Sequence, residues 1–349
     1  MPQSTLLIKR MKPGARPSTL SSISEQAVAT RLMMFDWVGM VLCTASASSF
    51  LIGITWGGAQ FPWSSWHTLV PIIVGAVDLV AAGLWEVYGT ERSFVRVSLL
   101  NSCPQLAAYI CAILQGIMLF CTLYYLPIFY EGVKDYTPTV AGIGLIPMTG
   151  SLLPIGILVG IIIRRTGHFR WAIWLGWLIS ILSSGLLILF NSDTRVYAWV
   201  LILIVVGLGH GLILIALNIC TQALADRADV GYAAAMYTFM RSIGMCIGVS
   251  VSGTILQNTL QTYMKDQNLD ASMAGAVVGI ISQLQDLPTT MRKPIAIAIG
   301  KSCDNVAEFL LGVATLALLV YLLIKESSLD KEFKPDHVLE GSADKKRAI

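Results

Sequence analysis

Long apolar runs separated by shorter polar segments dominate the pattern along the chain. Each run has about twenty residues, the length that an α-helix needs to cross a hydrocarbon core about 30 Å thick. We expect eight membrane spans, at about 38–57, 69–88, 105–126, 140–163, 171–190, 197–220, 233–256 and 306–324. The pattern therefore predicts an all-α integral membrane protein with about eight transmembrane helices.

The polar segments divide the chain into parts. We predict a basic and polar cytosolic tail at 1–35, two transmembrane helices within 36–90, a six-helix bundle at 103–324 and a charged cytosolic tail at 325–349. An outer loop is expected at about 257–305, where AGAVVGIISQLQDL repeats apolar residues at helical spacing. A helix of this kind would lie on the membrane surface or cap the outer mouth of the bundle.

Composition agrees with a membrane protein. Hydrophobic residues make up 55% of the 349 residues and charged residues only 13%, about half the charged share of a typical soluble domain. These values argue against a soluble enzyme. The net charge of +3 is small, so we expect the lipid bilayer, and no nucleic acid, as a partner.

Basic residues are unevenly distributed between the two sides of the predicted membrane. Cytoplasmic loops of membrane proteins keep an excess of Lys and Arg. If the N-terminus is cytosolic, most basic residues of the loops and tails fall on the cytosolic side, and the outer loops hold Lys134, Arg195, Lys265, Arg292, Lys293 and Lys301. We therefore expect a multi-pass protein with both termini in the cytosol.

Motifs of enzymes and of ATP-driven pumps are absent from the sequence. The four histidines lie in separate segments and form no H-E-x-x-H or other metal-ligand spacing. The sequence also contains no G-x-S-x-G elbow and no Walker loop. We therefore expect no catalytic residues, no bound metal and no cofactor.

Small residues recur within the predicted spans. Glycines four residues apart make a flat helix face that lets another backbone approach closely. With 30 glycines in an apolar chain such pairs also arise by chance, and both explanations stay open for Gly53/Gly57, Gly156/Gly160, Gly207/Gly211 and Gly244/Gly248. Small cysteines also occur in the apolar runs, where we expect them to pack as hydrophobic residues: Cys43, Cys111, Cys121, Cys220 and Cys246.

Two charged residues lie inside predicted spans. An ionised side chain near the bilayer centre costs about 2.5 kcal/mol or more and needs a partner or a watery cavity. Asp78 could carry a proton, or it could hydrogen-bond a neighbouring helix or stay protonated at the periphery. Arg241 could attract an anionic substrate or pair with a carboxylate, or its long side chain could reach the cytosolic interface.

Polar side chains in two other spans are candidates for a substrate or proton path. His210 and Asn218 are two turns apart and project from nearly the same helix face. A histidine in a transporter cavity can titrate near neutral pH, but a buried structural histidine is also possible here. Gln115, Tyr124 and Tyr125 could line a path through hydrogen bonds and aromatic contacts, or they could pack between helices.

Several segments resemble one branch of a known family, the fungal fourteen-span drug/proton antiporters of the major facilitator superfamily. They are FDWVGMVLCTASASSFLIGITWGGAQFPWSSWHTLVPIIVG, LPIFYEGVKDYTPTVAGIGLIP, GILVGIIIRRTGHFRWAIWLGW, MYTFMRSIGMCIGVSVSGTILQN and LIKESSLDKEF. The resemblance covers about 31–333. It implies the second-half bundle of the major facilitator fold, made of 3+3 inverted repeats and preceded by two linker helices.

The resemblance also implies a cytosolic motif loop, Gly-x-x-x-Asp-Arg-x-Gly followed by basic residues. Gly160, Arg165, Gly167 and Arg170 fit this motif, whereas Arg164 stands where the family has its acidic residue. The loop can still act as a basic hinge, but a latch between the acidic residue and a helix end is not implied.

The activity implied is transport and not catalysis: export of drugs or fungal secondary metabolites, small amphipathic molecules, driven by the proton gradient. The resemblance also implies the plasma membrane as the location. We expect Arg241, His210, Asn218, Gln115, Tyr124 and Tyr125 to face the central surface of the transporter, and Asp78 to face away. The family's first six-span bundle is missing from the matched region, so the alternative is a half-transporter without activity of its own, either a gene-model fragment or a subunit that needs a partner bundle.

Overall fold

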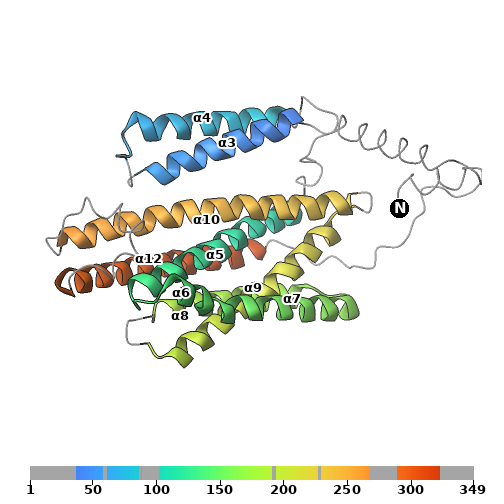
Figure 1. Ribbon diagram of the computed structural model, residues 1–349. Helices are drawn as coiled ribbons and strands as arrows, with labels where there is room; N and C mark the ends of the chain where they lie inside the picture. Colours follow the sequence, from blue (N-terminus) through green and yellow to red (C-terminus); the bar gives the residue numbers. More distant parts are fainter. Residues whose placement is uncertain are drawn as a thin grey trace, which may run out of the picture. The chain divides into compact units, whose positions relative to one another are not determined.

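A computed structural model of the chain describes residues 37–57, 61–85, 88, 102–190, 194–226, 229–266 and 289–322. Nine helices lie in these residues (Figure 1): α3 Trp37–Trp56, α4 Trp66–Leu84, α5 Cys103–Gly132, α6 Pro138–Gly144, α7 Ile146–Thr166, α8 Arg170–Leu187, α9 Val196–Leu224, α10 Val230–Asp266 and α12 Thr289–Tyr321. They provide eight stretches that are long and apolar enough to cross a membrane. The prediction of an all-α protein with about eight spans is confirmed.

The fourth span consists of α6 and α7, with Leu145 between them. Pro147 lies at the start of α7 and has no backbone N–H to donate, and its ring disfavours a straight helix through the preceding turn. A hydropathy pattern does not register this interruption, because all residues around Leu145 are apolar or small.

The helices on either side of the predicted outer loop are longer than the apolar pattern indicated. α10 continues to Asp266 and α12 begins at Thr289, so much of the expected loop at 257–305 is helical. The two polar extensions are linked, because Asn305 Nδ2 donates a hydrogen bond to Thr259 Oγ1 at 3.3 Å. The apolar pattern ends with the hydrocarbon core, whereas polar residues can continue a helix beyond it. The amphipathic segment within 267–288 and the tails at 1–35 and 325–349 lie outside the described residues.

The chain divides into two compact units. The smaller one holds α3 up to Phe50 and α4 from Pro71, and the larger one holds the rest of these two helices together with α5 to α12. Within the smaller unit the helices approach closely, because Ser49 Oγ donates to the Pro71 carbonyl at 3.1 Å and the backbone of Phe50 lies against Gly75. Absence of a side chain at Gly75 permits this approach.

Two glycine-lined crossings organise the six-span bundle of the larger unit. α10 crosses α5, and a Cβ on Gly248 would lie 2.6 Å from the Ile117 carbonyl oxygen. α9 crosses α7, and a Cβ on Gly211 would lie 2.7 Å from the Leu152 carbonyl oxygen. The partner helices also contribute glycines, Gly116 on α5 and Gly156 on α7. The spacing of glycines therefore marks real crossings at 156/160, 207/211 and 244/248.

The pairing of helices repeats within the bundle. In the first half of the bundle the three spans are α5, α6–α7 and α8, and in the second half they are α9, α10 and α12, in corresponding order. When each span is exchanged for its counterpart, the α5–α10 crossing becomes the α9–α7 crossing. The same exchange turns the packing of α8 on α9 into the packing of α12 on α5. This is the contact pattern expected of two three-helix repeats.

One end of the bundle is closed by aromatic and charged contacts. Phe129 packs on Phe190 and Tyr130 on Trp199, with ring centroids 5.6 and 5.3 Å apart. In the α5–α6 connection, Lys134 Nζ donates to the Thr194 carbonyl at 2.8 Å, and Asp135 forms an ion pair with Arg292 at the start of α12. The α5–α6 connection is thereby tied to two other parts of the bundle. These are the segment before α9 and the first turns of α12.

Candidate functional site

A polar cluster lies where α9 meets α10. Tyr237 on α10 is buried, and its hydroxyl donates a hydrogen bond to the Leu214 carbonyl of α9 at 2.9 Å. Arg241, one turn further along α10, lies near enough to Tyr237 and to His210 to interact electrostatically with both. The structure thus brings two predicted residues together, Arg241 and His210, around a tyrosine that the sequence reasoning did not single out.

His210 is only 2% exposed, and no described group forms a hydrogen bond with its Nδ1. Gln115 on α5 is fully buried, and no described group forms a hydrogen bond with its Nε2 or its Oε1. Its neighbour Gly116 lies against the backbone carbonyl of Arg241, so Gln115 is at the level of the polar cluster. Buried polar atoms of this kind are usually satisfied by internal water or by a ligand.

The six polar residues expected at one central surface lie in different surroundings in the structure. His210, Gln115 and Tyr125 are buried inside the bundle, Arg241 is half-buried and Tyr124 is exposed on α5. Residue spacing places side chains on helix faces, but it does not tell which neighbouring helix covers each face.

Asn218, Tyr124 and Tyr125 contact groups other than His210 and Arg241. Asn218 Oδ1 accepts a hydrogen bond from Gln222 Nε2 of the same helix at 2.6 Å, and along the helix axis it lies about 12 Å from His210. The Tyr125 hydroxyl donates to the Ser252 carbonyl and thereby joins α5 to α10. The Tyr124 ring packs edge-on against Tyr125, with centroids 5.8 Å apart.

Asp78 lies on α4 in the smaller unit. Its side chain is half-buried, and no described residue forms a hydrogen bond or an ion pair with it.

The residues of the motif loop terminate α7 and begin α8. Gly167 adopts a left-handed backbone with φ of 72°, and its N–H donates to the Ile163 carbonyl at 2.8 Å, which caps α7. Arg165 is exposed in the last turn of α7, where a positive charge complements the helix dipole. Arg170 begins α8 close to Tyr321 at the end of α12, and the Trp174 ring one turn further along α8 packs edge-on against the Tyr321 ring, with centroids 5.9 Å apart. Gly160 packs against Ile215 of α9.

The exposed face of α10 differs from those of the other long helices. Its exposed positions include Thr238, Ser242 and Cys246, which follow one another at helical spacing. Tyr232 is the only exposed large hydrophobic side chain among the described side chains of α10. Cys246 was expected to pack as a buried hydrophobe, which is wrong, whereas Cys111, Cys121 and Cys220 are buried as predicted. A four-residue period of small polar side chains in span 7 was the available signal for this face.

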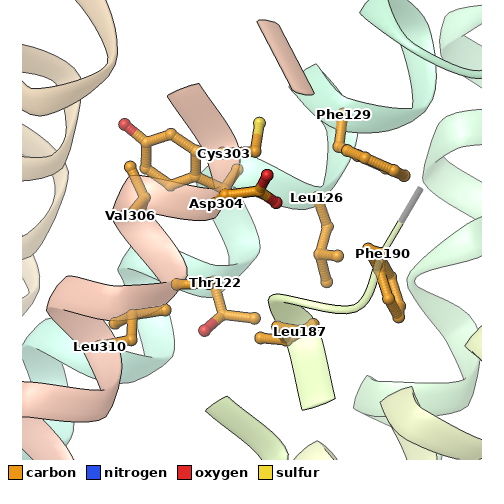
Figure 2. A pocket seen from close by; sticks show the side chains of 11 residues that line it. Thr122, Leu126, Phe129, Leu187, Phe190, Cys303, Asp304, Val306 and Leu310 are labelled. Carbon is orange, nitrogen blue, oxygen red and sulfur yellow. The ribbon is translucent and has the colours of Figure 1, made fainter. Parts of the chain in front are cut away.

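A small cavity lies between α5, α8 and α12 (Figure 2). Its volume is about 40 Å³. It contains an acidic side chain, Asp304, that we had placed in the outer loop and that the structure places in α12. The lining residues are Thr122, Tyr125, Leu126, Phe129, Leu187, Phe190, Cys303, Asp304, Val306, Ala307 and Leu310.

Comparison with known families identifies this fold. The family model described as Major Facilitator Superfamily matches residues 19–249. The chain belongs to this superfamily. Its members are membrane transporters and not enzymes, which agrees with the eight apolar helices of the described chain.

Curated relatives within the superfamily are fungal. The chain is 36% identical to "MFS transporter L2" of a Phoma species over 310 residues, which cover 86% of this chain and 51% of the relative. It is 27% identical to "MFS efflux transporter aclA" of Aspergillus oryzae, over 89% of this chain and 58% of the relative. The chain thus spans between half and three fifths of the length of these relatives.

A solved structure supports the fold alone. The chain resembles a bacterial homologue of the human lysosomal transporter Spinster in an inward-facing, occupied conformation, with a TM-score of 0.55 and 15% identity. The match covers 84% of this chain and 67% of the bacterial protein.

Proposed function

We propose that this chain takes part in the proton-coupled export of a small amphipathic molecule, as half of a major facilitator transporter. The names of its relatives support export: one is an "MFS efflux transporter", and another, 25% identical, is an "Acurin A biosynthesis cluster MFS-type transporter". A fungal secondary metabolite or a drug of similar character is the substrate class that we propose.

The exposed polar face of α10 is the observation that carries this proposal. The hydroxyls of Thr238 and Ser242 each donate to the carbonyl four residues earlier in α10, at 3.1 and 2.9 Å. Their oxygens can still accept a hydrogen bond, which lipid tails do not offer, so a surface of these two residues and Cys246 suits contact with water, substrate or protein. Arg241 lies on the same helix, one residue before Ser242, and connects this face to the buried Tyr237 and His210. A path along α10 would therefore have small polar side chains at its surface and further polar groups, Tyr237 and His210, buried behind them.

Substrate sites in transporters of this kind lie between two bundles. We therefore propose that a second six-helix bundle completes the path and that the protein works in the plasma membrane with both termini cytosolic. The proton gradient would supply the energy, without a cofactor. The alternative is a half-transporter that is inactive by itself. The chain spans about half the length of "MFS transporter L2".

A flux assay on reconstituted protein tests the proposal. The 349-residue chain is placed in liposomes, a proton gradient is imposed, and the efflux of a fluorescent amphipathic dye is followed with and without a protonophore. Flux that depends on the proton gradient and decreases in Arg241→Gln and Ser242→Val supports autonomous export. Without such flux, co-reconstitution with a six-helix bundle from a relative decides: restored flux supports the half-transporter, and none from either sample contradicts the proposal.

A further inference from the structure

The cavity between α5, α8 and α12 contains a carboxyl group that has no partner in the described structure. Figure 2 shows the Asp304 side chain directed from α12 towards Leu126 and Phe129 of α5. Asp304 is half-buried, and no described residue forms a hydrogen bond or an ion pair with its carboxylate. A cavity volume of about 40 Å³ can hold a few water molecules but not a drug-sized molecule.

The neutral polar groups around the cavity are already occupied. Thr122 Oγ1 donates to the Met118 carbonyl of its own helix at 2.9 Å, and the Tyr125 hydroxyl donates to Ser252 on α10. The other walls are aliphatic and aromatic, except for the thiol of Cys303. Water in the cavity is therefore the hydrogen-bond partner that remains available to Asp304.

The charged groups near Asp304 lie on its own helix. Lys301 precedes it by one turn, is exposed, and places its Nζ 5.4 Å from the centre of the Tyr263 ring on α10. Glu308 follows it by one turn and is also exposed. Both act electrostatically on Asp304, with opposite signs.

The neighbouring helices present no charge to the cavity. α5 contributes Thr122, Tyr125, Leu126 and Phe129, and α8 contributes Leu187. On the α10 side, Thr259 is hydrogen-bonded to Asn305, and Tyr263 lies beside Lys301. No described helix packed against α12 therefore supplies a positive charge that neutralises Asp304 within the cavity.

Asp304 lies where the apolar part of α12 begins. At 1.5 Å per residue it is about 26 Å along the helix axis from Tyr321, the last residue of α12. A hydrocarbon core about 30 Å thick that covers the apolar residues of α12 would reach the level of Asp304 at one edge. Ionisable residues in this position commonly mark ion or proton paths in transporters.

We propose that Asp304 is a proton-binding residue of this transporter. One carboxylate oxygen takes a proton from a hydronium ion in the cavity: the carboxyl O–H bond forms, one O–H bond of the hydronium ion breaks, and water is left. In the reverse step the carboxyl O–H bond breaks and a water molecule takes the proton to form hydronium again. This inference deepens the proposed proton coupling and rests on it for its biological role, but proton binding itself can be measured without transport.

Infrared difference spectroscopy on the full chain in lipid bilayers tests the inference. Between neutral and alkaline buffer exposed carboxyl groups stay ionised and give no C=O band of the protonated form. In this range the wild-type protein should show a pH-dependent C=O stretching band of a protonated carboxyl group. Asp304→Asn should remove this band, whereas Glu308→Gln, a matched change one turn away on the exposed side of α12, should retain it. A band of unchanged size in Asp304→Asn would overturn the assignment.

A measurement on the unaltered protein covers the case in which Asp304→Asn does not fold. A hydrophobic carbodiimide reacts with protonated carboxyl groups in apolar surroundings, and mass spectrometry locates the adduct. We expect the adduct on Asp304 in acidic buffer, at least tenfold less in alkaline buffer, and none on Glu308. No adduct on Asp304 at any pH would contradict the inference. Proton binding at Asp304 without flux would support this site and contradict the proposed export. Gradient-driven flux without proton binding at Asp304 would support export and contradict this site.

Discussion

α7 and α10 have equivalent roles in the bundle but opposite exposed faces. Each crosses a partner helix at glycines, α7 on α9 and α10 on α5, and the exchange of the two three-helix halves maps one crossing onto the other. The exposed large residues of α7 are aliphatic: Ile146, Leu153, Ile157, Leu158, Ile161 and Ile162. α10 exposes Thr238, Ser242 and Cys246 instead. Similar internal packing is thus combined with two different environments outside.

The difference indicates what each face contacts. Aliphatic side chains are suited to lipid tails, since nothing on them needs a hydrogen bond. A small polar face gains nothing from lipid and permits close approach of another helix or of water. The comparison therefore suggests lipid contact for α7 and a path or partner for α10.

The largest effect is expected at the crossings, which the two helices share. A leucine at Gly248 or at Gly211 would collide with the backbone of the partner helix, and neither α5 nor α7 can move without losing other contacts. We expect each variant to lose at least about 3 kcal/mol in the free energy of unfolding. Thermal unfolding in detergent micelles measures this loss.

The control is Gly185→Leu on α8, because a Cβ at this position has no atom within 4 Å. It should change the unfolding free energy by less than about 0.5 kcal/mol. If Gly248→Leu and Gly185→Leu unfold at the same temperature, close approach at the crossing does not stabilise the bundle.

A single arginine on each exposed face tests the difference directly. Leu153 on α7 is 65% exposed, and Leu153→Arg should cost about 2.5 kcal/mol or more because the charge enters hydrocarbon. Cys246→Arg, on the exposed face of α10, should cost less than half of this amount if that face contacts water or polar groups. The yield of membrane-inserted protein and its unfolding transition report both costs. Equal losses would place both faces in lipid.

Thiol labelling measures water access to the same two faces. The exposed Cys246 should react with a water-soluble maleimide at least tenfold faster than a cysteine introduced by Leu153→Cys, since the reagent and the thiolate both need water. The comparison uses intact liposomes and a background in which the other cysteines are replaced by alanine. Rapid labelling at position 153 and slow labelling at Cys246 would reverse the proposed environments.

The smallest effect concerns the inner side of the two helices. Tyr237→Phe removes the hydrogen bond from α10 to the Leu214 carbonyl and should cost about 1 kcal/mol in unfolding free energy. On α7, Ser151 Oγ donates mainly to carbonyls of its own helix, at 2.8 Å to Pro147, so Ser151→Ala should cost less. Chemical unfolding of the two variants side by side checks this order, which an equal or larger loss in Ser151→Ala would contradict.

Much of the fold could be predicted from local features of the sequence. The apolar runs indicated all eight spans, and the glycine spacing at 207/211 and 244/248 pointed to two crossings that the structure contains. Both signals depend on residues close together in the chain. The interruption at Leu145 and the polar ends of α10 and α12 escaped the same reasoning, because hydropathy follows the bilayer and not the backbone.

The candidate site was only partly predictable. Arg241 and His210 were identified as polar residues in apolar helices, and the structure brings them together. Tyr237 was missed because a tyrosine in a membrane helix is unremarkable until its hydroxyl is seen against the Leu214 carbonyl. Asp304 was missed because it lies just before the last apolar run, where a loop was expected.

The sequence by itself determined that this chain spans a membrane about eight times and resembles the major facilitator superfamily. Both conclusions rest on the length of apolar runs and on short motifs, which are properties of contiguous residues. Only the tertiary structure decided which faces are covered, that His210 and Gln115 are buried, that α10 exposes a polar face and that Asp304 lines a cavity. The physical reason is that burial depends on the helices packed around a residue, and these come from distant parts of the chain.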